Sequence, residues 1–277
     1  MSPLWRNWLR FRAHPSRCAR LHLGATGWRL DTGELPHAGT WGDLTPTAQT
    51  LAVSLNPALG SALVPAQAAA QAAAQCKQLA VVLDAHWART QLIHYPTALR
   101  ERRERQGYVE ALLRDTHGVD PTHWQILVEP CYGDEAVFAC AIEQATLTAL
   151  QTLAKTHGLR LISVQAAFVA CWQACRQQVT SVHGALAWLA DGRVSLGVWQ
   201  HSQWLALRTK RLQQTEAGAA DLTPLLQLML TSNGYAIEGG ILYLAGDKPL
   251  PTPTPAPGSL LPAGWTAQTL VMAGEHV

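Results

Sequence analysis

Apolar and polar positions follow their clearest pattern between Ala141 and Leu212. From residue 142 to 154 the apolar side chains recur on one helical face, and Gly158 follows with the freedom that a helix-ending turn needs. Residues 159–164 then alternate as in a strand, and residues 168–175 carry apolar side chains at the spacing of a short helix. The pattern therefore predicts helix, strand and helix in this order.

Three strand-like runs follow this helix, at residues 184–190, 193–199 and 204–212. Asp191–Gly192 joins the first two runs, and this pair tolerates the positive φ angles of a tight hairpin turn. We therefore expect a meander of three antiparallel strands in this part of the chain.

The remaining segments show weaker patterns of the same kinds. A hairpin is expected around Gly24–Gly27, and a short apolar run at Thr50–Leu55 could form a strand. The other expected elements are paired strands at 79–83 and 89–94, a helix at 97–117, a hairpin at 124–142, a helix at 217–233, and strands at 241–246 and 265–271. The order of hairpin, strand and helix therefore occurs in both halves of the chain.

Helix, strand, helix and a three-stranded meander is how the second half of an actin-like fold begins. Within that superfamily, the segment around Gly158–Leu159, Val164 and Phe168 resembles the junction between the lobes of the pilus and secretion platform proteins PilM, MshI and GspL (its cytoplasmic part). The resemblance spans roughly Ala19 to Asp247. It implies an α/β, bilobal actin-like (ribonuclease H-like) fold, in which helices flank the mixed sheet of each lobe.

The resemblance also implies a division of the chain. Residues 1–19 would form a basic aromatic N-terminal segment, residues 20–160 the first lobe and residues 161–248 the second lobe. Residues 249–277 would form a proline-rich loop and a C-terminal strand. The two lobes would meet near Val164 to Phe168.

Active members of the actin-like superfamily hold phosphates with two glycine hairpins, each of which carries an aspartate. The first hairpin of this chain would be His22–Gly27, where Gly24, Thr26 and Gly27 suit backbone donation to phosphate. His22 stands where the aspartate is expected, so a hard cation such as Mg²⁺ loses an oxygen ligand.

The second hairpin and the adenosine motif also depart from the superfamily pattern. Trp188 stands in the second hairpin, in the volume that a phosphate needs. The adenosine motif, Leu244–Asp247, keeps only Gly246. We therefore expect Gly24, Thr26, Gly27 and Gly246 to be the remains of a nucleotide site, with no catalytic residue and no bound cofactor.

Composition adds limits on partners and metals. The net charge of +2 and the absence of a long basic stripe argue against nucleic acid, and the low charged content of 14% suits a protein that is partly covered by partners. The six cysteines lack the spacing of a zinc site or a disulfide framework, and Cys171 and Cys175 are expected in the core. No apolar run approaches the length of a membrane span, so we expect a cytosolic protein with reduced thiols and no metal.

The N-terminal segment mixes tryptophans with arginines and has no acidic residue. The residues that would face a membrane from a helix are Trp5, Arg6, Trp8, Arg10, Phe11 and Arg12. Such a segment is typical of a helix on an anionic membrane surface, but its tryptophans could equally pack on the folded body.

These expectations combine into a function. The resemblance implies a non-catalytic scaffold, a pseudo-ATPase that is cytoplasmic and peripheral to the inner membrane, in a type IV pilus or type II secretion platform. Its partner would be the cytoplasmic segment of a PilN-like single-pass membrane protein. The alternatives are a divergent actin-like ATPase or sugar kinase, and an interaction module of another α/β fold.

Overall fold

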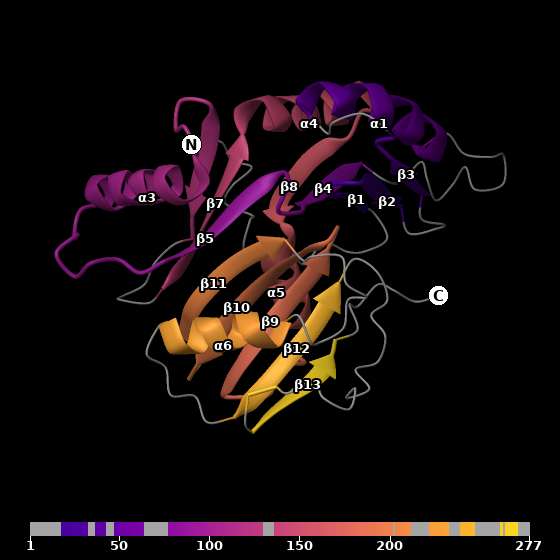
Figure 1. Cartoon of the computed structure of the whole chain (residues 1–277). Helices are drawn as coiled ribbons and strands as arrows, with labels where there is room; N and C mark the ends of the chain where they lie inside the picture. Colours follow the sequence, from indigo (N-terminus) through magenta and orange to yellow (C-terminus); the bar gives the residue numbers. More distant parts are fainter. Residues whose placement is uncertain are drawn as a thin grey trace. The chain divides into compact units, whose positions relative to one another are not determined.

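The computed structural model describes residues 18–32, 37–42, 47–63, 77–129, 136–201, 203–211, 222–232, 239–246, 261–262 and 264–270 (Figure 1). These residues form two compact units. The first unit takes the described residues of Met1–Arg89, Asp120–Ile126 and Ala141–Ala167. The second takes those of Thr90–Val119, Leu127–Cys140 and Phe168–Val277. The N-terminal segment with Trp5, Arg6, Trp8, Arg10, Phe11 and Arg12 lies outside the described residues.

The first unit is built on a five-stranded sheet with the order β3-β2-β1-β4-β8. Its strands are β1 (Cys18–Leu23), β2 (Gly27–Asp31), β3 (His37–Thr40), β4 (Gln78–Leu83) and β8 (Arg160–Ala166). The first three form an antiparallel meander, whereas β4 and β8 extend the sheet in parallel. Their core-facing side chains, such as Leu21, Leu23 and Val81, are fully buried.

Two helices that contact each other complete the first unit (Figure 1). They are α1 (Ala48–Leu63) and α4 (Gln144–Thr156). The strand expected at Thr50–Leu55 is wrong, because this run belongs to α1. Thr47 and Thr50 exchange side chain to backbone hydrogen bonds at the start of the helix, and the i, i+4 pair Leu51 and Leu55 is buried.

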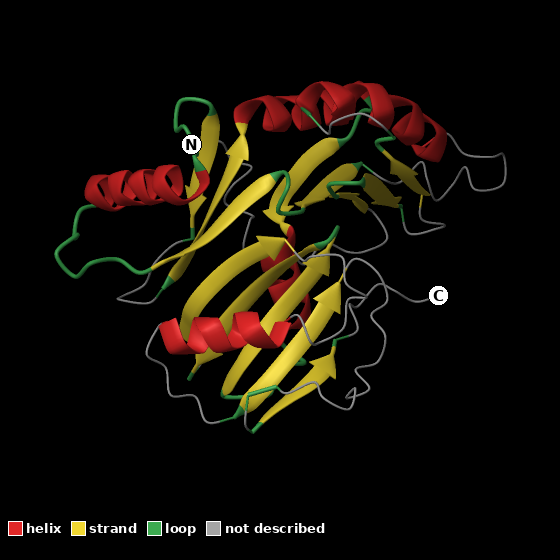
Figure 2. Cartoon of the chain, viewed as in Figure 1, coloured by secondary structure: helices red, strands yellow, loops and turns green. Residues whose placement is uncertain are grey.

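The second unit contains a five-stranded sheet with the order β11-β10-β9-β12-β13 (Figure 2). Its strands are β9 (His183–Ala190), β10 (Arg193–Gln200), β11 (Gln203–Arg211), β12 (Gly240–Gly246) and β13 (Trp265–Thr269). Here too an antiparallel meander comes first and two parallel strands follow. The two sheets therefore have the same strand order and the same strand directions, so the fold contains an internal repeat.

Helices cover both faces of the second sheet. One face packs its buried side chains, among them Val194, Leu196 and Val198, against α6 (Leu222–Ser232). The other face contacts α5 (Ala167–Cys175) through an aromatic cluster, in which neighbouring ring centroids lie 4.9–6.0 Å apart. The cluster consists of Phe138, Phe168, Trp172, Trp199, Trp204 and Tyr243.

Four elements are inserted between β4 and α4. They are β5 (Ala88–Ile93), α3 (Arg102–His117), β6 (Trp124–Val128) and β7 (Val137–Glu143). The strands form a third sheet with the order β5-β7-β6. The expected pairing of residues 79–83 with 89–94 is therefore wrong, because β4 lies between β1 and β8 whereas β5 pairs with β7. Both segments are strands, but the turn between them leads from one sheet into another.

The described cysteines are buried, and the core positions expected for Cys171 and Cys175 are confirmed. Burial raises the pKa of the Cys140 thiol to about 12, so that this thiol stays protonated at physiological pH. These side chains therefore act as small apolar groups of the core.

Gly197 makes room for the aromatic cluster, and this generates a prediction. A Cβ atom at Gly197 would lie 2.6 Å from ring atoms of both Phe168 and Trp204. We expect Gly197→Ala to lower the free energy of unfolding by about 1–3 kcal/mol, because two packed rings would have to move. Urea denaturation followed by circular dichroism measures this change.

The matched control is Gly107→Ala in α3, where an added Cβ atom meets nothing within 4 Å. It should raise the free energy of unfolding by about 0.5–1 kcal/mol, since alanine is the better helix former. A Gly197→Ala variant as stable as the natural chain would show that the cluster is not tightly packed.

Candidate functional site

The β1–β2 hairpin contains, in and directly after its turn, three of the four residues expected to be the remains of a nucleotide site. Gly24 and Thr26 lie in the turn, and Gly27 begins β2. The Gly24 N–H donates to the Gly27 carbonyl at 2.8 Å, which closes the turn on itself. Gly27 is also required sterically, because a Cβ atom there would lie 2.3 Å from the carbonyl oxygen of Gly39 on β3. The hairpin expected from the sequence is therefore confirmed.

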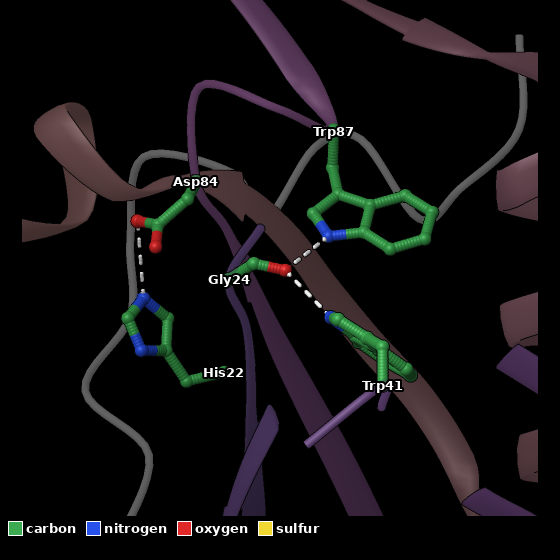
Figure 3. Close-up of polar contacts among 5 residues, drawn as sticks. All are labelled: His22, Gly24, Trp41, Asp84 and Trp87. Atoms are coloured by element: carbon green, nitrogen blue, oxygen red, sulfur yellow. Dashed lines mark hydrogen bonds and ion pairs between the residues drawn. The ribbon is translucent and has the colours of Figure 1, made fainter. Parts of the chain in front are cut away.

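Two tryptophans fix the orientation of this turn (Figure 3). The indole N–H of Trp41 donates to the Gly24 carbonyl at 3.1 Å, and that of Trp87 donates to the same oxygen at 2.9 Å. Both side chains are buried, and their rings meet edge to face at 5.8 Å. One carbonyl thus accepts two buried donors from segments that follow β3 and β4.

His22 and Asp84 form an ion-pair contact beside the same turn (Figure 3). The His22 Nε2 atom lies 3.3 Å from Asp84 Oδ1, and the Asp84 side chain is only 5% exposed. The Asp84 N–H also donates to the Leu23 carbonyl at 3.0 Å, which ties the end of β4 to the end of β1. A carboxylate is therefore present near the turn, but it belongs to β4 and faces an imidazole.

The hairpin of the second unit, β9–β10, contains the tryptophan that the sequence placed where a phosphate would bind. Asp191 and Gly192 form its turn with φ angles of 47° and 68°, as the sequence predicted. Trp188 on β9 is 8% exposed and lies opposite Ser195 on β10 and Ala245 on β12. The position is filled by a buried indole.

Counted from the parallel partner strands, His22 and Trp188 take the same place in the two sheets, whereas counted from the hairpin turns they differ by one residue, because the last antiparallel pairs are Leu23 with Trp28 and Ala190 with Arg193. The paired region of β1 and β4 ends at Leu23 and Leu83, and His22 is one residue before this end. The paired region of β9 and β12 ends at Leu189 and Gly246, and Trp188 is again one residue before the end. The parallel pairing thus agrees with the alignment that the sequence suggested for the two hairpins, the antiparallel pairing matches His22 to Leu189 instead, and the alignment stays a prediction.

The structure places the fourth candidate, Gly246, at the end of β12 in the second unit. Asp247, the carboxylate expected beside it, lies outside the described residues. That Gly24, Thr26, Gly27 and Gly246 form a vestigial nucleotide site stays a prediction, since each is described only within its own unit.

Sequence reasoning missed Trp41, Trp87 and the role of Asp84. Trp41 and Trp87 are 17 and 63 residues away from Gly24, and nothing in the local pattern links them to the turn. From the sequence, Asp84 was assigned only to the turn between the strands at 79–83 and 89–94. The one available signal was the parallel pairing of β1 with β4, which brings the residue after β4 beside the hairpin turn.

The described residues offer little to a metal ion. Within the described ranges no group of three or more His, Cys, Asp or Glu side chains is arranged to hold one. His22 and Asp84 supply only one nitrogen and one carboxylate, fewer than the three protein ligands that catalytic zinc sites use. In the same part of the chain, no helix is both long and apolar enough to cross a membrane.

No protein-family model matches the chain, and no curated protein matches it. Solved structures do. The PilM–PilN type IV pilus biogenesis complex matches with a TM-score of 0.57 and 13% identity, over 83% of this chain and 81% of that one. The cytoplasmic domain of EpsL, an inner-membrane component of the type II secretion system of Vibrio cholerae, matches with a TM-score of 0.51 and 15% identity, over 92% and 90%.

A third match is a Bacteroides thetaiotaomicron protein with an actin-like ATPase fold and unknown function. It has a TM-score of 0.52 and 11% identity, and the alignment covers 87% of this chain and 86% of that one. All three identities are low, so these similarities concern the fold. Together with the repeated sheet order, they show that this chain has the α/β, two-unit actin-like fold expected from its sequence.

The two indole hydrogen bonds at Gly24 generate a prediction. Trp87→Phe keeps most of the buried ring but removes one donor from the Gly24 carbonyl. We expect it to lower the free energy of unfolding by about 1–2 kcal/mol. Combining it with Trp41→Phe should cost more than the sum of the single changes, because the second change removes the other indole donor from the same carbonyl.

Guanidinium denaturation of the single and double variants measures this coupling. Trp124→Phe is the control, since the contact described for its ring is with the Arg89 guanidinium and its indole is not among those bonded to Gly24. Strictly additive losses would mean that the two indoles do not share one acceptor in solution.

Proposed function

We propose that this chain is a non-catalytic scaffold, a pseudo-ATPase of the actin-like fold that serves the inner-membrane platform of a type IV pilus or type II secretion system. The observation that carries the proposal is the β1–β2 turn. Its aspartate position is His22, which contacts Asp84, and its Gly24 carbonyl accepts hydrogen bonds from two buried indoles.

This arrangement disfavours a bound nucleotide for two reasons. Mg²⁺ prefers oxygen ligands, and the imidazole of His22 replaces the carboxylate that the superfamily pattern places at the turn. The nearby carboxylate of Asp84 is buried and faces His22, so recruiting it to a cation would separate the two side chains. In the second unit, Trp188, which matches His22 when the parallel strands are aligned, supplies a large apolar side chain where a phosphate would require polar donors.

The platform role rests on the two similar structures whose assemblies are known. One is part of a type IV pilus biogenesis complex with PilN, and the other is the cytoplasmic domain of an inner-membrane secretion component. Each is covered over four fifths or more of its length by this chain. By analogy, we propose a cytoplasmic protein, peripheral to the inner membrane, that binds the cytoplasmic segment of a PilN-like single-pass protein.

A second candidate function is a divergent actin-like ATPase or sugar kinase. The observation that favours it is Asp84, a carboxylate that directly follows a parallel strand and lies beside the hairpin turn. In an enzyme, this group would have to leave His22 and bind a cation or act as a base. Nucleotide binding separates the two candidates.

We expect no binding of ATP with magnesium at micromolar concentrations by isothermal titration calorimetry. His22→Asp alone should not restore binding, because it would place two carboxylates beside each other and leave Trp188 in the second unit. A micromolar dissociation constant for the natural chain would contradict the pseudo-ATPase proposal and favour the enzyme.

The membrane role can be tested with vesicles. We expect the chain to co-sediment with vesicles that display the cytoplasmic segment of the PilN-like protein of the same organism, at any ionic strength near the physiological value. Bare anionic vesicles should retain the chain only at low salt, and only if residues 1–18 are present, because arginine–lipid attraction is screened. A chain that begins at Ala19 and still binds the displayed segment would separate the partner contact from the N-terminal contact.

Failure of the full chain to bind the displayed segment would contradict the proposed partner. Equal binding of the full and shortened chains to bare vesicles would contradict a membrane role for Trp5, Arg6, Trp8, Arg10, Phe11 and Arg12.

A further inference from the structure

We propose that the second half of β11, Ala206–Arg211, is a docking edge at which an extended acidic segment of a partner protein adds to the second sheet as a further strand. This inference concerns the second unit alone and does not depend on the function proposed above.

The position of β11 in the sheet is the first argument. β11 is the terminal strand in the order β11-β10-β9-β12-β13, so β10 is its only neighbour in this sheet. A strand at the end of a sheet directs half of its backbone N–H and C=O groups away from the sheet, where another extended chain can pair with them.

A bulge divides β11 into two parts of different character. The register with β10 shifts between Val198 and Trp199, which leaves Leu205 without an opposite residue. The Leu205 carbonyl contacts His94 Nε2 at 3.0 Å, and the preceding Trp204 belongs to the aromatic cluster. The first part of the edge is therefore engaged within the second unit. After the bulge, Ala206–Arg211 pairs residue by residue with β10.

The second part of the edge is strongly basic. Arg208, Thr209, Lys210 and Arg211 are all exposed. Arg208 and Lys210 lie opposite Leu196 and Val194, on the sheet face that packs against α6, whereas Arg211 projects to the other face. Positive side chains thus flank the exposed backbone on both faces of the sheet.

These charges are not neutralised by the described parts of the chain. Arg211 lies directly opposite Arg193, and like charges in this arrangement are unfavourable. Across the described residues, no carboxylate forms a salt bridge with Arg193, Arg208, Lys210 or Arg211. An acidic strand placed beside β11 would pair with its backbone and offset this repulsion at the same time.

Protection against edge-to-edge association is the alternative explanation, since lysines on edge strands prevent pairing. The opposite edge of the same sheet argues against it. β13 (Trp265–Thr269) contains no charged residue, although it is equally a terminal strand. A membrane surface is a weaker fit, because a flat layer of lipid headgroups would meet the cations of one sheet face and not those of the other.

Fluorescence anisotropy of the full chain with a labelled hexapeptide of alternating glutamate and valine tests the proposal. We expect saturable binding at low salt that weakens as salt rises. The double variant Arg208→Glu, Lys210→Glu should weaken it by about tenfold or more, because two attractive charges become repulsive. Its control, Arg100→Glu with Arg103→Glu, makes the same change in net charge at exposed positions near α3 and should leave binding unchanged.

Two further experiments test whether the peptide binds as a strand and whether a membrane binds in its place. A hexapeptide of alternating glutamate and proline has the same charge but lacks half of the N–H donors. We therefore expect its affinity to be about tenfold lower than that of the valine peptide. Equal affinity for both peptides would overturn strand addition. The second experiment measures binding of the chain to vesicles of phosphatidylcholine and phosphatidylserine. Binding to them that requires Arg208 and Lys210, without binding of the valine peptide, would overturn the proposal in favour of a membrane.

Circular dichroism must first show that each variant is folded. The four substituted side chains are exposed, so loss of the fold is not expected. If no peptide binds the natural chain even at low salt, the proposal that β11 accepts an acidic strand is wrong.

Discussion

The Gly24 carbonyl is the point on which the first unit's hairpin depends. Two buried indoles donate to this one oxygen, and they come from segments that follow two different strands. A buried carbonyl without donors costs on the order of 1–3 kcal/mol, so the two indoles couple the stability of the turn to that of the segments that follow β3 and β4. These contacts lie at the turn that the superfamily pattern, taken from the sequence, assigns to a phosphate. In the scaffold proposed above, the contacts that stabilise the hairpin would therefore also be those that disfavour a bound nucleotide.

The sequence predicted elements well where the signal is local. The hairpin around Gly24, the meander around Asp191–Gly192 and the strand at Ile241–Gly246 all follow from turn residues and apolar alternation, and all are present. The run at Thr50–Leu55 was misjudged because six apolar and polar residues fit a strand as well as a helix. Only the capping threonines and the partner helix α4 decide in favour of the helix.

Pairing between distant segments was much harder to predict. The strands at 79–83 and 89–94 are separated by a short turn, which suggests a hairpin, yet they enter different sheets. The candidate site shows the same limit. His22 and Trp188 could be found by aligning the two hairpins, whereas Trp41, Trp87 and Asp84 reach the turn through sheet pairing that no local pattern encodes. Side-chain chemistry was readable from the sequence, but the partner of each side chain was not.

The interleaving of the two units along the chain has a consequence for how the protein can form. The chain passes from the first unit to the second after Arg89, returns at Asp120, leaves again after Ile126, and returns once more at Ala141. Neither unit is a continuous segment, so no single cut separates them. During synthesis the first unit lacks α4 and β8 until Ala166 has left the ribosome, and by then parts of the second unit have already emerged. The nascent chain must therefore hold both units unfinished at once, which makes this stage the one most dependent on protection from aggregation.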